Sequence, residues 1–346
     1  MAGGPARKLA KELRKSSLRS PPEIFVELGS WGAFLFCCGM AGWGMENISS
    51  FRMAFGTMQF GGRADEAASA AMFEACLGAG LTHFDTACGY NEGASETILG
   101  ALAAAHRGRL YIATKVGYVG GGGRANMTAQ FDGSRRRLGM DSVDLLYLHR
   151  YDPDTPLEET IETFADFQSR GLIAHIGLSN FPAWAVMKAQ AVAARMGTKI
   201  DAIQPMYNLV KRQAEVEILP MAADQGIAVH SYSPLGGGLL TGKYAAGGAG
   251  RLAEDSRYNA RYSAFAAHET AAGLARLARE VGIEAPTLAV AWVMARGVCP
   301  IISARNAGQL APSLKALSVM LPPDLLARIT ALSTTPPPAT DRSEEA

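Results

Sequence analysis

Four residues of the types that move protons stand at or just after short apolar runs typical of β-strands. These residues are Asp85, Tyr90, Lys115 and His149, and the runs are 82–85, 110–114 and 144–148. The carboxyl ends of parallel barrel strands point to one face, so we expect the four side chains to converge there. Such a set can protonate a carbonyl oxygen while hydride reaches the carbon. The residue types therefore point to carbonyl chemistry.

Each of the four has an expected role. A free phenol has a pKa near 10, and we predict that the ammonium of Lys115 lowers the pKa of Tyr90 by favouring the phenolate. Asp85 would hold Lys115 by a charge-assisted hydrogen bond, and His149 would donate to the substrate oxygen and orient it. The alternative is a structural ion pair between Asp85 and Lys115, with the other two as ordinary rim residues.

Strand and helix patterns alternate along the chain. Strands are expected at 53–57, 82–85, 110–114, 144–148, 174–178, 201–204, 226–231 and 299–302. Helices are expected at 65–77, 95–105, 127–138, 182–195, 213–224, 266–280 and 286–296, and one more opens at Leu157 and stops before Gly171. Eight short apolar strands alternating with helices predict an α/β fold with a single (β/α)8 TIM barrel. A doubly wound sheet competes, but the loop at 56–62 lacks its Gly-x-Gly-x-x-Gly motif.

The pattern divides the chain into three parts. Residues 53–332 form the barrel, 333–346 read as a flexible polar tail, and 1–52 read as a weakly ordered N-terminal extension. The extension is basic over its first twenty residues, and its apolar stretch at 31–40 is too short to span a bilayer. Either a targeting peptide or an upstream extension fits this segment.

Composition limits the classes of binding partner and compartment that we expect. A net charge of +1 argues against nucleic acid, and we expect neither a nucleic-acid nor a membrane partner. The five cysteines show neither zinc-site nor disulfide spacing, which favours a reducing compartment, and we expect the cytoplasm. The six histidines include no His-x-His pair, so we expect no metal site. The oligomeric state stays open.

None of the four proton-moving residues can supply hydride, so a nicotinamide cofactor is implied. Asn180 and Gln204 could pair with its carboxamide, although Asn180 could instead cap the helix after it. Tyr232 could stack on the nicotinamide ring. The glycines that follow it would admit a pyrophosphate, which Lys243 could neutralise.

Four short segments carry a family resemblance. Phe84-Asp85-Thr86-Ala87, Gly89-Tyr90, Ala113-Thr114-Lys115 and Leu148-His149 resemble the aldo-keto reductase superfamily, and the likeness runs from about residue 53 to 321. The resemblance implies NADPH-dependent reduction of an aldehyde or ketone, a small-molecule carbonyl substrate, to an alcohol. Tyr90 would be the general acid, helped by Asp85, Lys115 and His149.

The resemblance also implies how the cofactor is held. Arg305 would pair with a 2′-phosphate, which favours NADPH while NADH stays open, and Pro312-Ser313 departs from the acidic residue and asparagine common in the family. The full set of expected cofactor contacts is Gly56, Thr57, Met58, Asp85, Ser179, Asn180, Gln204, Tyr232, Ser233, Pro234, Leu235, Gly236, Gly238, Lys243, Ser303, Arg305, Gln309 and Ser313. Two other functions stay open: an NADPH-binding, redox-sensing regulatory subunit, and a Schiff-base aldolase using Lys115.

Overall fold

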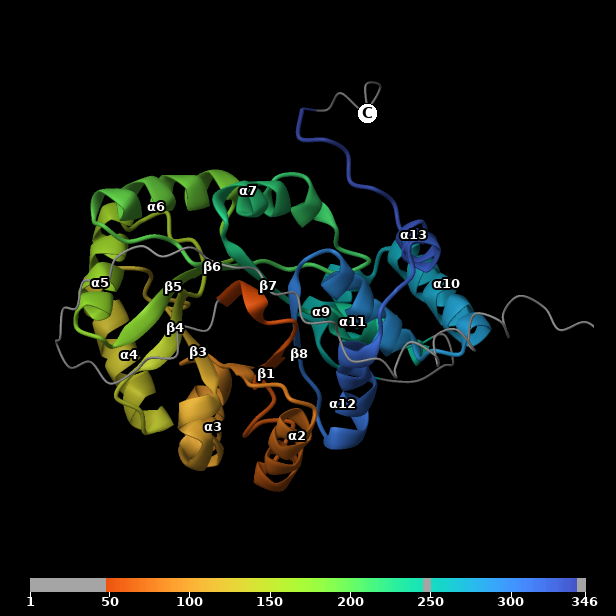
Figure 1. Ribbon diagram of the computed structural model, residues 1–346, viewed down its shortest axis with the longest axis horizontal. Helices are drawn as coiled ribbons and strands as arrows, with labels where there is room; N and C mark the ends of the chain where they lie inside the picture. The colour runs from red at the N-terminus through yellow and green to blue at the C-terminus, as the bar shows by residue number, and fades with distance from the viewer. Residues whose placement is uncertain (1–47, 245–249, 341–346) are drawn as a thin grey trace, which may run out of the picture.

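Eight parallel strands close into a barrel in chain order, with the helices around it (Figure 1). The computed structural model describes residues 48–244 and 250–340. The strands are β1 (Ala54–Gly56), β2 (His83–Asp85), β3 (Tyr111–Val116), β4 (Val143–Leu148), β5 (Ile173–Ser179), β6 (Ala202–Gln204), β7 (Ala228–Tyr232) and β8 (Cys299–Ile302). The prediction of a (β/α)8 TIM barrel is confirmed.

The strands alternate between two environments. Phe84, Ile112 and Leu146 point outward into the main hydrophobic core beneath the helices. Ala113 and Tyr147, one position along their strands, point into the barrel interior. This period of two places Asp85 and Lys115 inside the barrel at its carboxyl end.

The expected helices are present, and most lie within three residues of their predicted bounds; the helix expected from 213 begins at Ile218, after the 3-10 helix η5 (Gln213–Glu215). The expected helices are α2 (Glu66–Gly78), α3 (Ala94–Ala103), α4 (Arg124–Leu138), α5 (Leu157–Ser169), α6 (Ala183–Arg195), α7 (Ile218–Gln225), α10 (Phe265–Val281) and α11 (Ala285–Ala295). The Asp65 side chain caps α2 by accepting from the backbone N–H of Ala68 at 2.8 Å.

Within residues 48–244 and 250–340, four further helices are present that the sequence pattern did not predict. They are α8 (Arg251–Glu254), α9 (Ser256–Tyr262), α12 (Ala307–Leu314) and α13 (Pro323–Thr330). Asp255 caps α9 and Asn306 caps α12, each by accepting from a backbone N–H two or three residues ahead. Leu325 and Ile329 are the buried residues of α13, and this helix lies beside α10 in Figure 1. Short amphipathic turns such as these carry little periodicity.

The amino end of the barrel is covered by residues just before β1. Ile48, in the 3-10 helix η2 (Ile48–Ser50), is buried, and the ring of Phe51 lies 4.8 Å from the ring of His83 and 4.7 Å from that of Tyr111. The packed region thus begins before Met53, the expected boundary. The rest of the expected extension, 1–47, and the last six residues of the expected tail lie outside the described residues. Over the described ranges, no helix combines the length and apolar character needed to cross a bilayer.

Candidate active site

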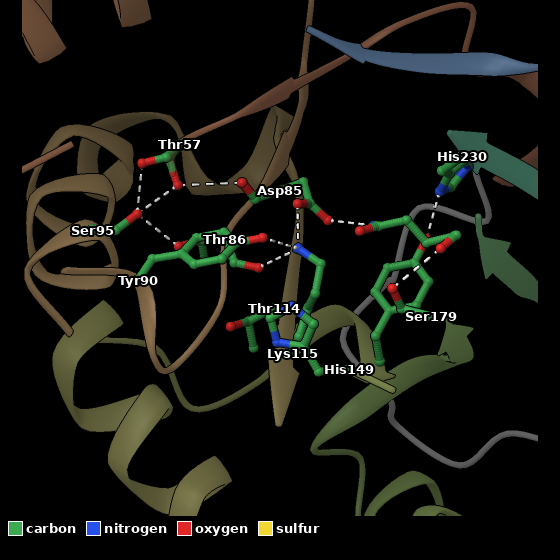
Figure 2. Close-up of polar contacts among 12 residues, drawn as sticks. Thr57, Asp85, Thr86, Tyr90, Ser95, Thr114, Lys115, His149, Ser179 and His230 are labelled. Atoms are coloured by element: carbon green, nitrogen blue, oxygen red, sulfur yellow. Dashed lines mark hydrogen bonds and ion pairs between the residues drawn. The ribbon is translucent and has the colours of Figure 1, made fainter. Parts of the chain in front are cut away.

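Lys115 lies at the centre of a buried polar group at the carboxyl end of the barrel (Figure 2). Its ammonium donates to Asp85 Oδ1, to the backbone carbonyl of Thr86 at 2.7 Å, and to the phenol oxygen of Tyr90 at 3.4 Å. An ammonium has three donors, so each one has an acceptor. Asp85 also accepts from Gln204 Nε2 at 2.9 Å. The structure therefore brings the predicted acid, lysine and aspartate together.

The protonation states follow from burial and charge. Burial by itself would lower the pKa of Lys115, but Asp85 and Tyr90 outweigh it, and the pKa of Lys115 is raised. Burial raises the pKa of Tyr90, and the charge of Lys115 offsets this rise only in part. Lys115 lowers the pKa of Tyr90 as predicted, but the prediction left out burial, which outweighs this effect and keeps the pKa above its ordinary value. The phenol keeps its proton at neutral pH, with an ammonium beside it.

His149 directly follows β4 and faces the phenol. Its backbone N–H donates to the carbonyl of Val116 at 2.8 Å, and its ring packs edge to face against Tyr90 with centroids 5.8 Å apart. Burial, with the charges of Lys115 and Arg150, lowers the pKa of His149 to about 3. The imidazole is neutral at physiological pH, so one ring nitrogen is a donor and the other an acceptor.

The loop that carries Tyr90 is held by hydrogen bonds that sequence reasoning missed. Asn91 adopts a left-handed backbone (φ 49°), and its side-chain amide donates to the carbonyls of Met58 at 3.0 Å and Phe60 at 2.7 Å. Ser95, at the start of α3, lies 3.0 Å from the hydroxyl of Thr86. An asparagine directly after Gly89-Tyr90 was the available signal, because asparagine tolerates this conformation.

The two predicted amides reach the same rim. Asn180 has a left-handed backbone (φ 58°) and donates to the carbonyl of His149 at 3.0 Å. Its amide oxygen accepts from the phenol of Tyr232 at 2.7 Å. Helix α6 has Pro182 at its N-cap, so Asn180 does not cap it. Asn180 and Gln204 therefore bond His149 and Asp85, two of the predicted proton-moving residues.

The glycine turn after β7 is the expected place for a pyrophosphate. Gly236, Gly237 and Gly238 all have positive φ, at 57°, 65° and 98°. A Cβ added at Gly237 would lie 2.7 Å from the ring of Tyr258, and one at Gly238 would lie 3.5 Å from the ammonium of Lys243. Residues with side chains would strain or fill this turn, whereas glycines let a phosphate approach the backbone beside a cation.

Three of the expected cofactor contacts are buried. Thr57 is fully buried, with its hydroxyl 2.8 Å from that of Ser95. Ser313 is buried on α12. Gly56 is closely packed, because a Cβ there would lie 2.9 Å from Ile301. The contacts of these three residues with a cofactor stay predictions.

The remaining expected contacts differ in exposure. Ser179, Pro234 and Gly236 are buried. Exposed surface remains on Met58, Tyr232, Ser233, Leu235, Gly238, Lys243, Ser303 and Gln309. Arg305 is partly exposed, but its guanidinium pairs with Glu254 at 2.6 Å, and Glu254 also pairs with Arg63 at 3.2 Å. Arg305 must therefore exchange partners to hold a 2′-phosphate.

Known proteins resemble the chain over most of its length. Residues 52–334 match the model of the Aldo/keto reductase family. An uncharacterized oxidoreductase of Bacillus subtilis (strain 168) is 33% identical over 307 residues, covering 82% of this chain and 92% of the relative. A probable voltage-gated potassium channel subunit beta of Oryza sativa subsp. japonica is 31% identical over 324 residues, covering 86% and 97%.

A third relative matches a shorter stretch. Aflatoxin B1 aldehyde reductase member 2 of Homo sapiens is 40% identical over 195 residues, covering 55% of this chain and 54% of the relative. The family match spans the whole barrel, and the predicted proton-moving residues meet at its carboxyl end. The chain therefore belongs to the aldo/keto reductase family, and its general role is that of an oxidoreductase.

Proposed function

We propose that the protein reduces an aldehyde or ketone to an alcohol with NADPH. The observation that carries this proposal is the phenol of Tyr90, protonated and 3.4 Å from the ammonium of Lys115. A reduced nicotinamide supplies the hydride when it is bound. The residues of this chain then have to bind the carbonyl, orient it and deliver one proton.

Tyr90 is the general acid in this proposal. Its raised pKa keeps it protonated until the carbonyl oxygen gains negative charge and takes the proton. Lys115 stabilises the phenolate that remains, and its bonds to Asp85 and the Thr86 carbonyl prevent it from moving away. Neutral His149 can donate a ring N–H to the same oxygen and fix its direction.

The choice of NADPH rests on Arg305. The guanidinium can bind a 2′-phosphate bidentately once it leaves Glu254. Lys243, beside the glycine turn, would neutralise the pyrophosphate. NADH stays open because Glu254 competes for the same guanidinium. The spacing of the cysteines supports a reducing compartment, and we propose the cytoplasm.

A Schiff-base aldolase is disfavoured by the state of Lys115. Imine formation needs a neutral amine with a lowered pKa. Here the pKa is raised, and all three ammonium donors are engaged. Borohydride trapping with a carbonyl substrate should therefore leave no stable adduct on Lys115.

The test is the Tyr90→Phe variant assayed with a panel of aldehydes, ketones and sugars. Binding of NADPH, followed by fluorescence, should change by no more than a few-fold. Carbonyl reduction, followed by NADPH absorbance, should fall about 10²- to 10⁴-fold, because proton donation is lost. Tyr118→Phe is the matched control, since its ring lies beside His149 with centroids 4.9 Å apart. Retained turnover in Tyr90→Phe would falsify the assignment of the acid.

A second candidate function is a nucleotide-binding regulatory subunit. The relative from Oryza sativa that is named as a probable channel subunit beta supports it, because this chain covers 97% of that protein. Reduction with excess carbonyl substrate separates the two functions. Many turnovers per protein favour the reductase, whereas one slow oxidation of bound NADPH followed by arrest favours the sensor.

A further inference from the structure

A second polar cluster lies inside the barrel at the end opposite the proposed acid. His83 opens β2, Cys299 opens β8, and His230 lies within β7. One nitrogen from each histidine and the sulfur of Cys299 lie within 4.8 Å of one another. The three side chains are 0%, 1% and 6% exposed. Their wide separation in the sequence hid the cluster, since only barrel closure brings β2, β7 and β8 together.

Both ring nitrogens of His83 lack partners in the part of the chain that the structure describes, since neither makes a hydrogen bond there. The His230 ring has a backbone hydrogen bond with Ile48, which a metal ion on this ring would displace. Buried polar atoms in native proteins are almost always paired, so the two nitrogens of His83 need an explanation.

The other nitrogen of His230 is already oriented. Nδ1 lies 2.8 Å from the phenol oxygen of Tyr147, which is itself fully buried. If Nδ1 carries the proton, it donates to that oxygen and leaves Nε2 free as an acceptor. This arrangement, in which the far nitrogen of a histidine is held by a polar group, is typical of metal-binding histidines.

We propose that His83, His230 and Cys299 bind one zinc ion that ties β2 to β7 and β8. Imidazole nitrogen and thiolate sulfur are the ligands that zinc prefers, at about 2.0–2.1 Å and about 2.3 Å. At such bond lengths, the ligand atoms need to approach one another by roughly 1 Å from their present spread, a side-chain adjustment. A water molecule would complete the tetrahedron.

The proposal also needs an entry path for the ion and a balance of protons on binding. His230 and Cys299, with Ile48 and Phe51, line a cavity of about 510 Å³ at the amino end of the barrel, and the ion would enter from this side. Cys299 is buried with its thiol free of a disulfide. Binding would break its S–H bond, form one Zn–S and two Zn–N bonds, and release one proton to solvent. No electron transfer is involved.

The experiment uses the full chain, stripped of metal with a chelator and titrated with zinc against a chromophoric competitor. We expect one equivalent of tightly bound zinc, and at least a tenfold loss of affinity in Cys299→Ser. Cys76→Ser, which removes another buried thiol, should bind as the parent does. The double variant Cys37→Ser/Cys38→Ser should also retain binding. Tyr147→Phe should weaken binding about 10- to 100-fold, because it frees His230 to rotate.

Cobalt gives a spectroscopic readout independent of activity. The cobalt-loaded parent should show a thiolate-to-metal charge-transfer band that Cys76→Ser keeps and Cys299→Ser loses. If Cys299→Ser does not fold, X-ray absorption of the zinc-loaded parent decides, with one sulfur in the first shell expected. The absence of tight zinc binding, a shell without sulfur, or loss of binding only in Cys37→Ser/Cys38→Ser would overturn the proposal. A buried water between the nitrogens would then be the simpler occupant.

Discussion

Replacing Lys115 by methionine tests the polar centre of the site. The side chains of Lys115 and Asp85 are 0% and 4% exposed, so the variant leaves a carboxylate buried with Gln204 as its remaining side-chain donor. Removing one partner of a buried ion pair costs about 3–5 kcal/mol of unfolding free energy. The double variant Lys115→Met/Asp85→Asn removes both charges, and we expect it to recover most of that loss.

In the variants Lys115→Met and Lys115→Met/Asp85→Asn, the effects on activity and on stability should differ. Neither variant has an ammonium beside Tyr90, so both should lose carbonyl reduction by orders of magnitude even where the double variant is well folded. Urea unfolding at pH 7 gives the free energies, and NADPH absorbance gives the rates. A double variant as unstable as the single one would refute the charge argument. Parent-like turnover in either variant would refute the role of the ammonium.

Two further predictions concern the neighbouring charges. With a pKa lowered to about 3, His149 favours the folded state above its unfolded pKa of about 6.5 and loses that contribution as pH falls towards 3. Between pH 6.5 and 4, the unfolding free energy of His149→Gln should therefore fall less steeply than that of the parent. The two slopes should differ by about 1.4 kcal/mol per pH unit. Equal slopes in urea titrations would contradict this. Arg305→Ala should weaken the binding of NADPH more than that of NADH. Glu254→Gln should strengthen the binding of NADPH, because it frees the guanidinium of Arg305. Fluorescence titrations showing equal changes for both nucleotides would exclude the 2′-phosphate contact.

The barrel and the proton-moving residues were predictable because each depends on local pattern. Strand ends in a parallel barrel share one face, so Asp85, Lys115 and His149 could be placed together from their positions alone. Tyr90 lies after the strand at 82–85. Its place near the other three residues was predictable because Gly89 breaks the chain just after that strand. The periodicity of the helices gave bounds within a few residues, since most pack one face on the barrel.

What could not be predicted depends on contacts between distant residues. The pairing of Arg305 with Glu254 joins the loop after β8 to the end of α8, and nothing near either residue in the sequence indicates it. The burial of Ser313 depends on how α12 packs. The net direction of the pKa of Tyr90 depends on the balance of burial against one ammonium, and sequence alone gives only the ammonium.

The position of Phe51 has a practical consequence. Its ring lies against the rings of His83 and Tyr111, outside the segment that strand patterns mark as the barrel. Trimming the protein at Met53 would keep every side chain of the proposed active site but would remove the ring that packs against His83 and Tyr111. Loss of yield or heat tolerance after such trimming would then reflect a missing structural part, with the chemistry at the mouth untouched.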